Sequence, residues 1–243
     1  TSTSITINQD IDLPTVSISP SSATLTCANP SVTLTANGIG TYQWSTGATS
    51  QTITASSTGT YSITLTGSNG CSNTASISVT ADQTAPSLSI SPSSATLTCA
   101  NPTATLTALG TGSVRWSTGS IDPQIQVSTA GTYSVTLTTP GGCTATTSVL
   151  IQQDNTVPTV SISPNSATLT CANPSVALTA NGIGTYQWST GANSQTISAG
   201  SSGTYSVTVT SDNGCFASAS IQIQQDNSCL LYTSPSPRDT PCY

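Results

Sequence analysis

Residues 32–66 read VTLTANGIGTYQWSTGATSQTITASSTGTYSITLT, and this stretch decides the fold class. Apolar side chains such as Val32 and Leu34 alternate with threonine and serine over short runs. Such alternation turns one face of a β-strand toward a core and the other toward solvent. Dipeptides such as Asn37-Gly38 supply turn signals between the runs. The stretch therefore predicts short strands joined by tight turns, as in a β-sandwich.

The same pattern recurs along the chain with a period of 72 residues. A unit of this length suits a small autonomous domain better than a solenoid repeat. We therefore predict an all-β protein made of tandem β-sandwich domains. The residues in phase are Trp44, Trp116 and Trp188; Tyr61, Tyr133 and Tyr205; Cys27, Cys99 and Cys171; Cys71, Cys143 and Cys215.

The period divides the chain into three full repeats and two end segments. We expect repeats at 14–86, 87–158 and 159–228. Residues 3–10 (TSITINQD) align with residues 75–82 (ASISVTAD), the last strand expected in the first repeat. We therefore interpret residues 1–13 as the last strand of a truncated preceding repeat.

Composition excludes most catalytic chemistry. The chain has 2 Lys+Arg, 8 Asp+Glu and no His, and only 4% of its residues are charged, against an average of about 25%. Ser-His-Asp triads, Schiff-base lysines and His-ligated metals cannot be built, and nucleic-acid binding needs clustered Lys and Arg. We expect no enzyme activity, no cofactor, no nucleic-acid partner and no membrane span in this fragment. The 48 threonines and 43 serines indicate hydroxyl-covered sheets.

The cysteines indicate disulfide bonds. Six cysteines allow fifteen connectivities, but two per repeat favour pairing within each repeat. Each such bridge would contribute roughly 4 kcal/mol in the chain-entropy account and would indicate an extracellular or cell-surface location. Metal binding is not expected, because two cysteines per repeat without histidine are too few for a zinc site. Free buried thiols are the remaining alternative to disulfides. The expected pairs are Cys27–Cys71, Cys99–Cys143 and Cys171–Cys215.

The segments that follow Cys27, namely SVTLTA, YQWSTGATSQTIT, STGTYSITLT and NGC, carry a resemblance. They resemble the bacterial immunoglobulin-like or PKD-like repeats of large Bacteroidota surface proteins. The resemblance implies tandem immunoglobulin-like β-sandwiches and a role as adhesin, stalk or gliding-associated component. It places Ala36 and Ile63 where an antibody-type domain carries its bridging cysteines, so that an apolar contact replaces that bridge. It also makes Tyr61 similar to a tyrosine corner.

The end of the chain departs from the repeats. Residues 229–239 read CLLYTSPSPRD and resemble the conceptual translation of a sequencing adapter. We therefore expect residues 229–243 to be a non-native tail and leave its two cysteines out of the pairing.

Two residue sets invite a binding role beside a structural one. We expect the three tryptophans (Trp44, Trp116, Trp188) and three tyrosines (Tyr61, Tyr133, Tyr205) to be core residues. An exposed aromatic row would instead favour carbohydrate binding. The junctions 10–14, 82–86 and 154–158 run from Asp to Pro, and carboxylates at such boundaries bind Ca²⁺ in some arrays. Because Ca²⁺ takes six to eight oxygens, we expect short proline-stiffened linkers rather than metal sites.

These expectations lead to a structural function. We predict an extracellular stalk, filament or adhesin shaft whose partners are neighbouring repeats, other copies of the chain or surface glycans. One alternative is a carbohydrate-binding or cell-adhesion module. The other is a self-assembling filament subunit, in which residues 3–10 complete the sandwich of a neighbouring chain by strand addition.

Overall fold

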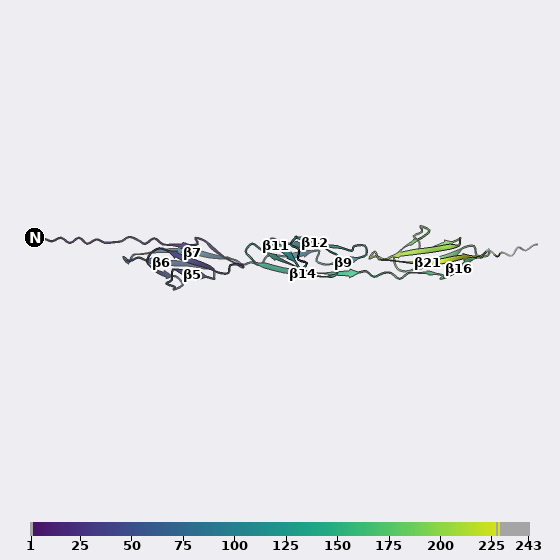
Figure 1. The fold of residues 1–243 in the computed structure, drawn as a ribbon, viewed down its shortest axis with the longest axis horizontal. Coiled ribbons are helices and arrows are strands. Elements are labelled where there is room, and N and C mark those ends of the chain that lie inside the picture. The colour runs from purple at the N-terminus through teal and green to yellow at the C-terminus, as the bar shows by residue number, and fades with distance from the viewer. Residues whose placement is uncertain (1, 227, 229–243) are drawn as a thin grey trace, which may run out of the picture. The chain divides into compact units, whose positions relative to one another are not determined.

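The computed structural model describes residues 2–226 and residue 228, and every regular element in that range is a β-strand. The strands form three sets that follow one another along the chain (Figure 1). Each set has seven strands in the same order. The first repeat contains β1 (Ser17–Ser19), β2 (Ala23–Thr26), β3 (Val32–Asn37), β4 (Thr41–Trp44), β5 (Thr52–Ala55), β6 (Gly59–Thr66) and β7 (Ser72–Asp82).

The second and third repeats contain the equivalent strands. The second has β8 (Ser89–Ser91), β9 (Ala95–Thr98), β10 (Ala104–Leu109), β11 (Ser113–Trp116), β12 (Gln124–Val127), β13 (Gly131–Thr138) and β14 (Thr144–Asp154). The third has β15 (Ser161–Ser163), β16 (Ala167–Leu169), β17 (Val176–Asn181), β18 (Thr185–Trp188), β19 (Thr196–Ala199), β20 (Gly203–Thr210) and β21 (Phe216–Gln225).

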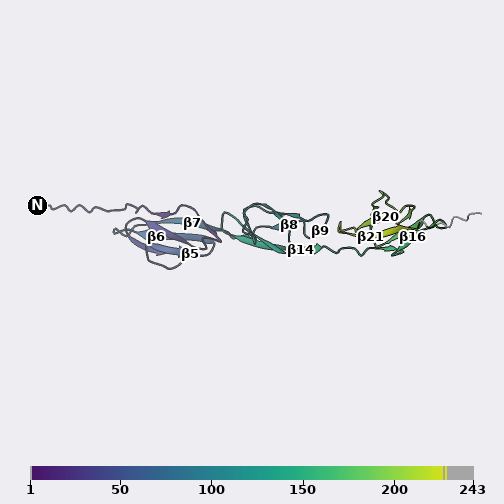
Figure 2. The ribbon, with the colours of Figure 1, turned by 45° about the vertical axis from the view of Figure 1, so that its right-hand side comes forward.

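Each repeat forms a three-stranded and a four-stranded sheet. In the first repeat the orders are β1-β3-β5 and β2-β7-β6-β4. Strand β1 pairs antiparallel with β3, whereas β2 pairs parallel with β7. The chain therefore passes from one sheet to the other at Ser19-Pro20, between β1 and β2. The other repeats have equivalent orders, and in the third β20 and β21 lie side by side (Figure 2). These are three tandem immunoglobulin-like β-sandwiches, and the predicted fold class is confirmed.

The alternating side chains form the cores. In the first repeat Leu34, Ala36 and Ile63 are fully buried in one apolar cluster. Trp44 belongs to the same cluster, and its indole N–H donates to the carbonyl of Ser50 at 2.9 Å. Each tryptophan is 2% exposed, so no ring face is available at the surface. Trp116 and Trp188 donate in the same way to the carbonyls of Asp122 and Ser194.

The tyrosines expected in the core are half-buried rather than buried. Tyr61, Tyr133 and Tyr205 share this intermediate exposure. The hydroxyl of Tyr61 donates to the carbonyl of Ser57 at 3.1 Å, and Tyr205 makes the same bond to Ser201. A phenol needs a polar partner for its hydroxyl, so its ring packs on the core from the rim.

The chain ends differ from the repeats. No strand is assigned over residues 2–16, including the segment TSITINQD expected to be a last strand. A single strand without neighbours has no ladder partners for its backbone groups, which explains the missing assignment. The expected tail at 229–243 lies outside the described residues. In the described part of the chain no helix has the length and apolarity needed to cross a bilayer.

The chain groups into two compact units. Among the described residues, one unit comprises those up to 93, 106–125 and 132–149, and the other comprises 94–105, 126–131 and those from 150 onward. The second repeat thus contributes segments to both units.

Candidate functional site: disulfide clasps between repeats

The two disulfides described with both partners join consecutive repeats, and the expected pairing within repeats is wrong. Cys27 of the first repeat bonds to Cys143 of the second, and Cys99 of the second bonds to Cys215 of the third. Each bridge spans 116 residues and lies within one compact unit. Cys171 is also disulfide-bonded. Cys71 is a free cysteine.

The geometry of the last strand explains the correction. Cys27 follows β2, whose final residue Thr26 pairs with Asp82 at the end of β7. Cys71 instead precedes Ser72, where β7 begins. Since a strand advances about 3.3 Å per residue, the two cysteines lie roughly 35 Å apart at opposite ends of the sandwich. A disulfide needs Cα atoms within about 7 Å, so pairing within a repeat is excluded.

The bonded cysteines come from a short loop and a hairpin. The Cα atoms are 4.9 Å apart in the first bridge and 5.0 Å apart in the second. We call each bridge with its loop and hairpin a clasp. The first clasp joins loop 26–29 to hairpin 139–143, and the second joins loop 98–101 to hairpin 211–215.

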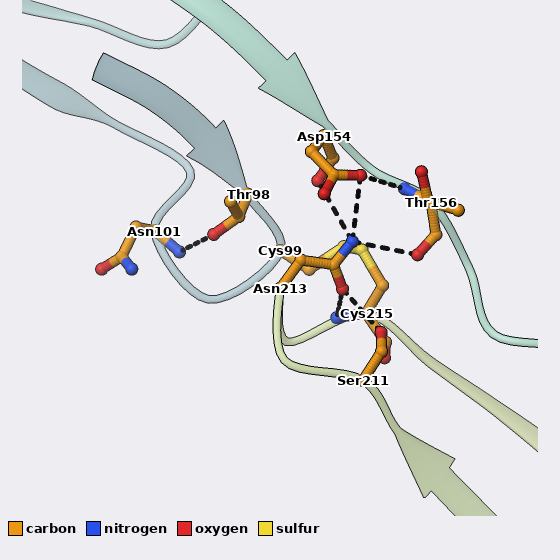
Figure 3. The surroundings of a disulfide bond; sticks show 8 residues. All are labelled: Thr98, Cys99, Asn101, Asp154, Thr156, Ser211, Asn213 and Cys215. Carbon is orange, nitrogen blue, oxygen red and sulfur yellow. Dashed lines mark hydrogen bonds between the residues drawn. A yellow bond between two sulfur atoms is a disulfide. The ribbon is translucent and has the colours of Figure 1, made fainter. Parts of the chain in front are cut away.

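The loop of the second clasp is closed by its own threonine (Figure 3). The hydroxyl of Thr98 accepts the backbone N–H of Asn101 at 3.1 Å, and the N–H of Thr98 donates to the carbonyl of Asn101 at 2.9 Å. The loop then donates the N–H of Ala100 to the carbonyl of Asn213 at 3.1 Å. Thus a backbone hydrogen bond accompanies the disulfide between the two repeats.

Asn213 connects the hairpin to the linker between the repeats. Its amide nitrogen donates to the Asp154 carboxylate at 3.2 Å and to the carbonyl of Thr156 at 3.0 Å. Its amide oxygen accepts the N–H of Cys215 at 3.0 Å (Figure 3). One side chain therefore fixes both the direction of the linker and the position of the bonded cysteine.

The carboxylate of Asp154 is held in its charged form. Hydrogen bonds from the side chain and then the backbone of Thr156, followed by one from the side chain of Asn213, lower the pKa of Asp154 from its usual value. Donors that favour the ionised form act in this direction. Among residues 2–226 and 228, no group of three or more Asp, Cys, Glu or His side chains is placed to hold a metal ion.

A glycine lets the loop and the hairpin touch. Gly214 has a φ of 80°, and a Cβ added there would lie 2.5 Å from the Cβ of Ala100. In the first clasp Gly142 also has a φ of 80°, and an added Cβ would lie 2.6 Å from the Cβ of Ala28. Any side chain at these positions would force the clasp apart.

The first clasp lacks the asparagine. Gly141 stands at the position of Asn213, and its carbonyl accepts the N–H of Ala28 at 3.0 Å. The sulfur of Cys143 lies 3.9 Å from the carbonyl oxygen of Asp82, the last residue of β7 in the first repeat. The first clasp therefore keeps the disulfide and the backbone bond, but no side chain joins its hairpin to the linker in this way.

The clasps are closed structures rather than reactive sites. Cys143 and Cys215 are 3% and 1% exposed, so one sulfur of each bridge is shielded from attack. Beside the second clasp lies a shallow groove of about 750 Å³, lined by linker residues 156–159, Ile183 and Asn213 among others. Asp154 and Asp212 are the ionisable groups in its lining.

Sequence reasoning selected the cysteines of the clasps but missed Asn213 and Gly214 as functional residues. An Asn-Gly dipeptide precedes both Cys71 and Cys215, and by itself such a dipeptide indicates only a tight turn. The sequence carried no signal that Cys27 and Cys71 lie at opposite ends of the sandwich, because that placement depends on the parallel pairing of β2 with β7.

Known proteins resemble the chain in structure only. No family model and no curated protein matches it. A structure described as a Ca²⁺-stabilised adhesin that helps an Antarctic bacterium bind ice has a TM-score of 0.48 at 13% identity, covering 89% of this chain and 75% of that one. A structure of titin domains I67–I69 has a TM-score of 0.41 at 11% identity, and the match covers 88% of this chain and 98% of that one. Sidekick-1 immunoglobulin domains 1–5 have a TM-score of 0.35 at 14% identity, and the chain spans 58% of that structure's length. The chain is similar to the titin and Sidekick-1 structures in its tandem immunoglobulin-like fold.

Proposed function

We propose that the chain is part of an extracellular structural array, a stalk or adhesin shaft, whose clasped modules transmit tension. The observation that carries this proposal is that the bridges Cys27–Cys143 and Cys99–Cys215 each join two different repeats. A bridge within a repeat protects only that repeat, whereas a bridge between repeats reinforces the junction. Disulfides of this kind persist in oxidising surroundings, which supports a location outside the cell.

The two bridges overlap along the chain. The span from Cys27 to Cys143 contains Cys99, and the span from Cys99 to Cys215 contains Cys143. One backbone cut anywhere between Cys27 and Cys215 therefore leaves the two pieces covalently joined. This includes cuts in the linkers, which are the usual weak points of a modular protein.

Carbohydrate binding finds no support in the aromatic residues. The ring faces that would stack on sugars belong to Trp44, Trp116 and Trp188, which are buried. Completion of a neighbour's sandwich by the segment 3–10 stays a prediction, because that segment would pair only with a second chain. The structural role is therefore the function that the geometry favours.

The proposal is tested by cutting one linker and pulling on the chain. A protease recognition sequence is inserted between Asp82 and Pro86, and the protein is cleaved after oxidative folding. The cleaved chain should run as one species in non-reducing denaturing electrophoresis and as two after reduction. Held by its ends in a single-molecule instrument, it should still bear load until reductant is added. A cleaved, oxidised chain that separates without reductant would refute the proposal.

A further inference from the structure

The hairpin that carries Cys71 is built like the clasp hairpin that carries Cys215. Asn69 donates to the Asp10 carboxylate at 3.1 Å and to the carbonyl of Asp12 at 2.9 Å. The N–H of Cys71 donates to the Asn69 amide oxygen at 3.0 Å. Asn213 makes the same three contacts, with Asp154, Thr156 and Cys215. The asparagine contacts of a clasp hairpin are thus all present at Cys71, although Gly67 replaces Ser211, whose hydroxyl donates to the carbonyl of Cys215 at 2.9 Å.

What differs is the loop that faces the hairpin. Cys215 and Cys143 are buried against Cys-Ala-Asn loops, whereas Cys71 is half-buried and free. Gly70 has a φ of 82°, close to that of Gly214, yet an added Cβ there would meet nothing within 4 Å. The surface that Ala100 contacts in the second clasp is open beside Gly70.

The segment ahead of the first repeat matches in sequence the strand end beside which such a loop lies in the second clasp. In the second clasp, β9 pairs parallel with β14, from Ile151 with Ala95 to Asp154 with Thr98, which places Cys99 at the linker. Residues 7–10 read INQD and match IQQD at 151–154. A strand ending in Thr-Cys-Ala-Asn-Pro could pair with residues 7–10 in the same register and deliver its cysteine to Cys71.

We propose that Cys71, Asn69, Gly70 and residues 7–10 form a docking site for the Thr-Cys-Ala-Asn-Pro loop of a further repeat of this type, joined ahead of residue 3. The product is a third clasp, with a disulfide between the loop cysteine and Cys71. The two thiols lose two protons and two electrons, and a small disulfide such as oxidised glutathione takes them up to become two glutathione thiols. The inference rests on the match between the two hairpins, and it does not depend on whether the array acts as a stalk or an adhesin shaft.

The main experiment adds the missing repeat. Residues 87–146 are placed directly ahead of Thr3 in the full chain, which is folded in a glutathione redox buffer. Peptic digestion without reductant, followed by mass spectrometry, should yield a peptide pair linking the added copy of Cys99 to Cys71. The pairs Cys27–Cys143 and Cys99–Cys215 in the same digest show that the rest of the chain has folded. A control with serine in the added copy of Cys99 should leave Cys71 open to alkylation.

A second experiment needs no added domain. The peptide ATLTCANP, supplied as its mixed disulfide with glutathione, reacts with the Cys71 thiol by exchange and releases glutathione as a thiol. It should modify Cys71 at equilibrium at least about five-fold more than a scrambled peptide, because native contacts favour its product. Gly70→Ala should remove that preference, since its methyl group would meet the incoming alanine. Equal modification of Cys71 by the two peptides would overturn the proposal. So would an extended chain in which Cys71 stays open to alkylation or bonds to Cys27.

Discussion

Single residues decide whether a loop and a hairpin can meet. The comparison of Gly214 with Gly70 isolates that contact, because both glycines have a left-handed φ but only Gly214 faces an alanine. Replacing either with alanine costs about 1 kcal/mol of backbone strain. At Gly214 the added methyl group should cost roughly 1–3 kcal/mol more, as overpacking does. We expect Gly214→Ala to lower the thermal midpoint more than Gly70→Ala, as followed by circular dichroism. Equal shifts would mean that the Ala100 contact carries no energy.

The carboxylate of Asp154 makes the second clasp sensitive to acid. Its pKa is lowered in the folded chain, chiefly by Thr156, so its contribution is complete above the ordinary pKa of about 3.9 and is lost as the pH falls through the lowered value. Between about pH 5 and pH 2, the thermal midpoint of the wild type should therefore fall further than that of Asp154→Asn. The exposed Asp212 in the same hairpin provides the matched control, Asp212→Asn. Parallel pH profiles for wild type and Asp154→Asn would contradict this account.

The strands were predictable because each repeat satisfies the same short-range rules. Alternation places Leu34 and Ala36 on a buried face, and the period of 72 residues repeats that choice three times. The partner of each cysteine was not predictable from spacing, because a separation of 44 residues and one of 116 differ by one period. Only the parallel pairing of β2 with β7 places Cys27 at the far end of the sandwich from Cys71. That pairing depends on a sheet change near Pro20, which the alternation pattern does not reveal.

The hairpin of the first clasp has Gly141 where that of the second has Asn213, and this difference can be tested by substitution. A Cβ added at Gly141 would lie 3.6 Å from the Thr26 side chain, an ordinary contact. Gly141→Asn should give the first clasp the linker contacts that Asn213 makes in the second, and one such hydrogen bond contributes about 1 kcal/mol. We expect the thermal midpoint to rise by a few degrees. Gly141→Ala controls for the reduced freedom of the unfolded chain, and an asparagine variant no more stable than the alanine variant would refute the prediction.

At the scale of the molecule, the bridges tie together sandwiches whose cores contain no bridge between their sheets. Ala36 and Ile63 fill the place of such a bridge in the first repeat. The double variant Cys99→Ser/Cys215→Ser should therefore keep a β-rich circular dichroism spectrum. Its thermal midpoint should fall, because closing a span of 116 residues stabilises by up to about 5 kcal/mol in the chain-entropy account. Cys71→Ser, which removes the free thiol, should leave the midpoint unchanged. Loss of the β-rich spectrum in the double variant would show that folding itself requires the bridge.

The overlap of the two bridges also sets the route of mechanical force through an unravelled chain. A pull at both ends follows the shortest covalent path, from Cys27 across sulfur to Cys143, then backwards along the chain to Cys99, and across sulfur again to Cys215. The stretch 99–143 would bear the load in reverse, with its carboxyl end toward the amino terminus of the chain. The rest of the polypeptide would hang as slack loops, so even a fully unfolded oxidised chain would stop lengthening at roughly four tenths of the reach of the reduced one.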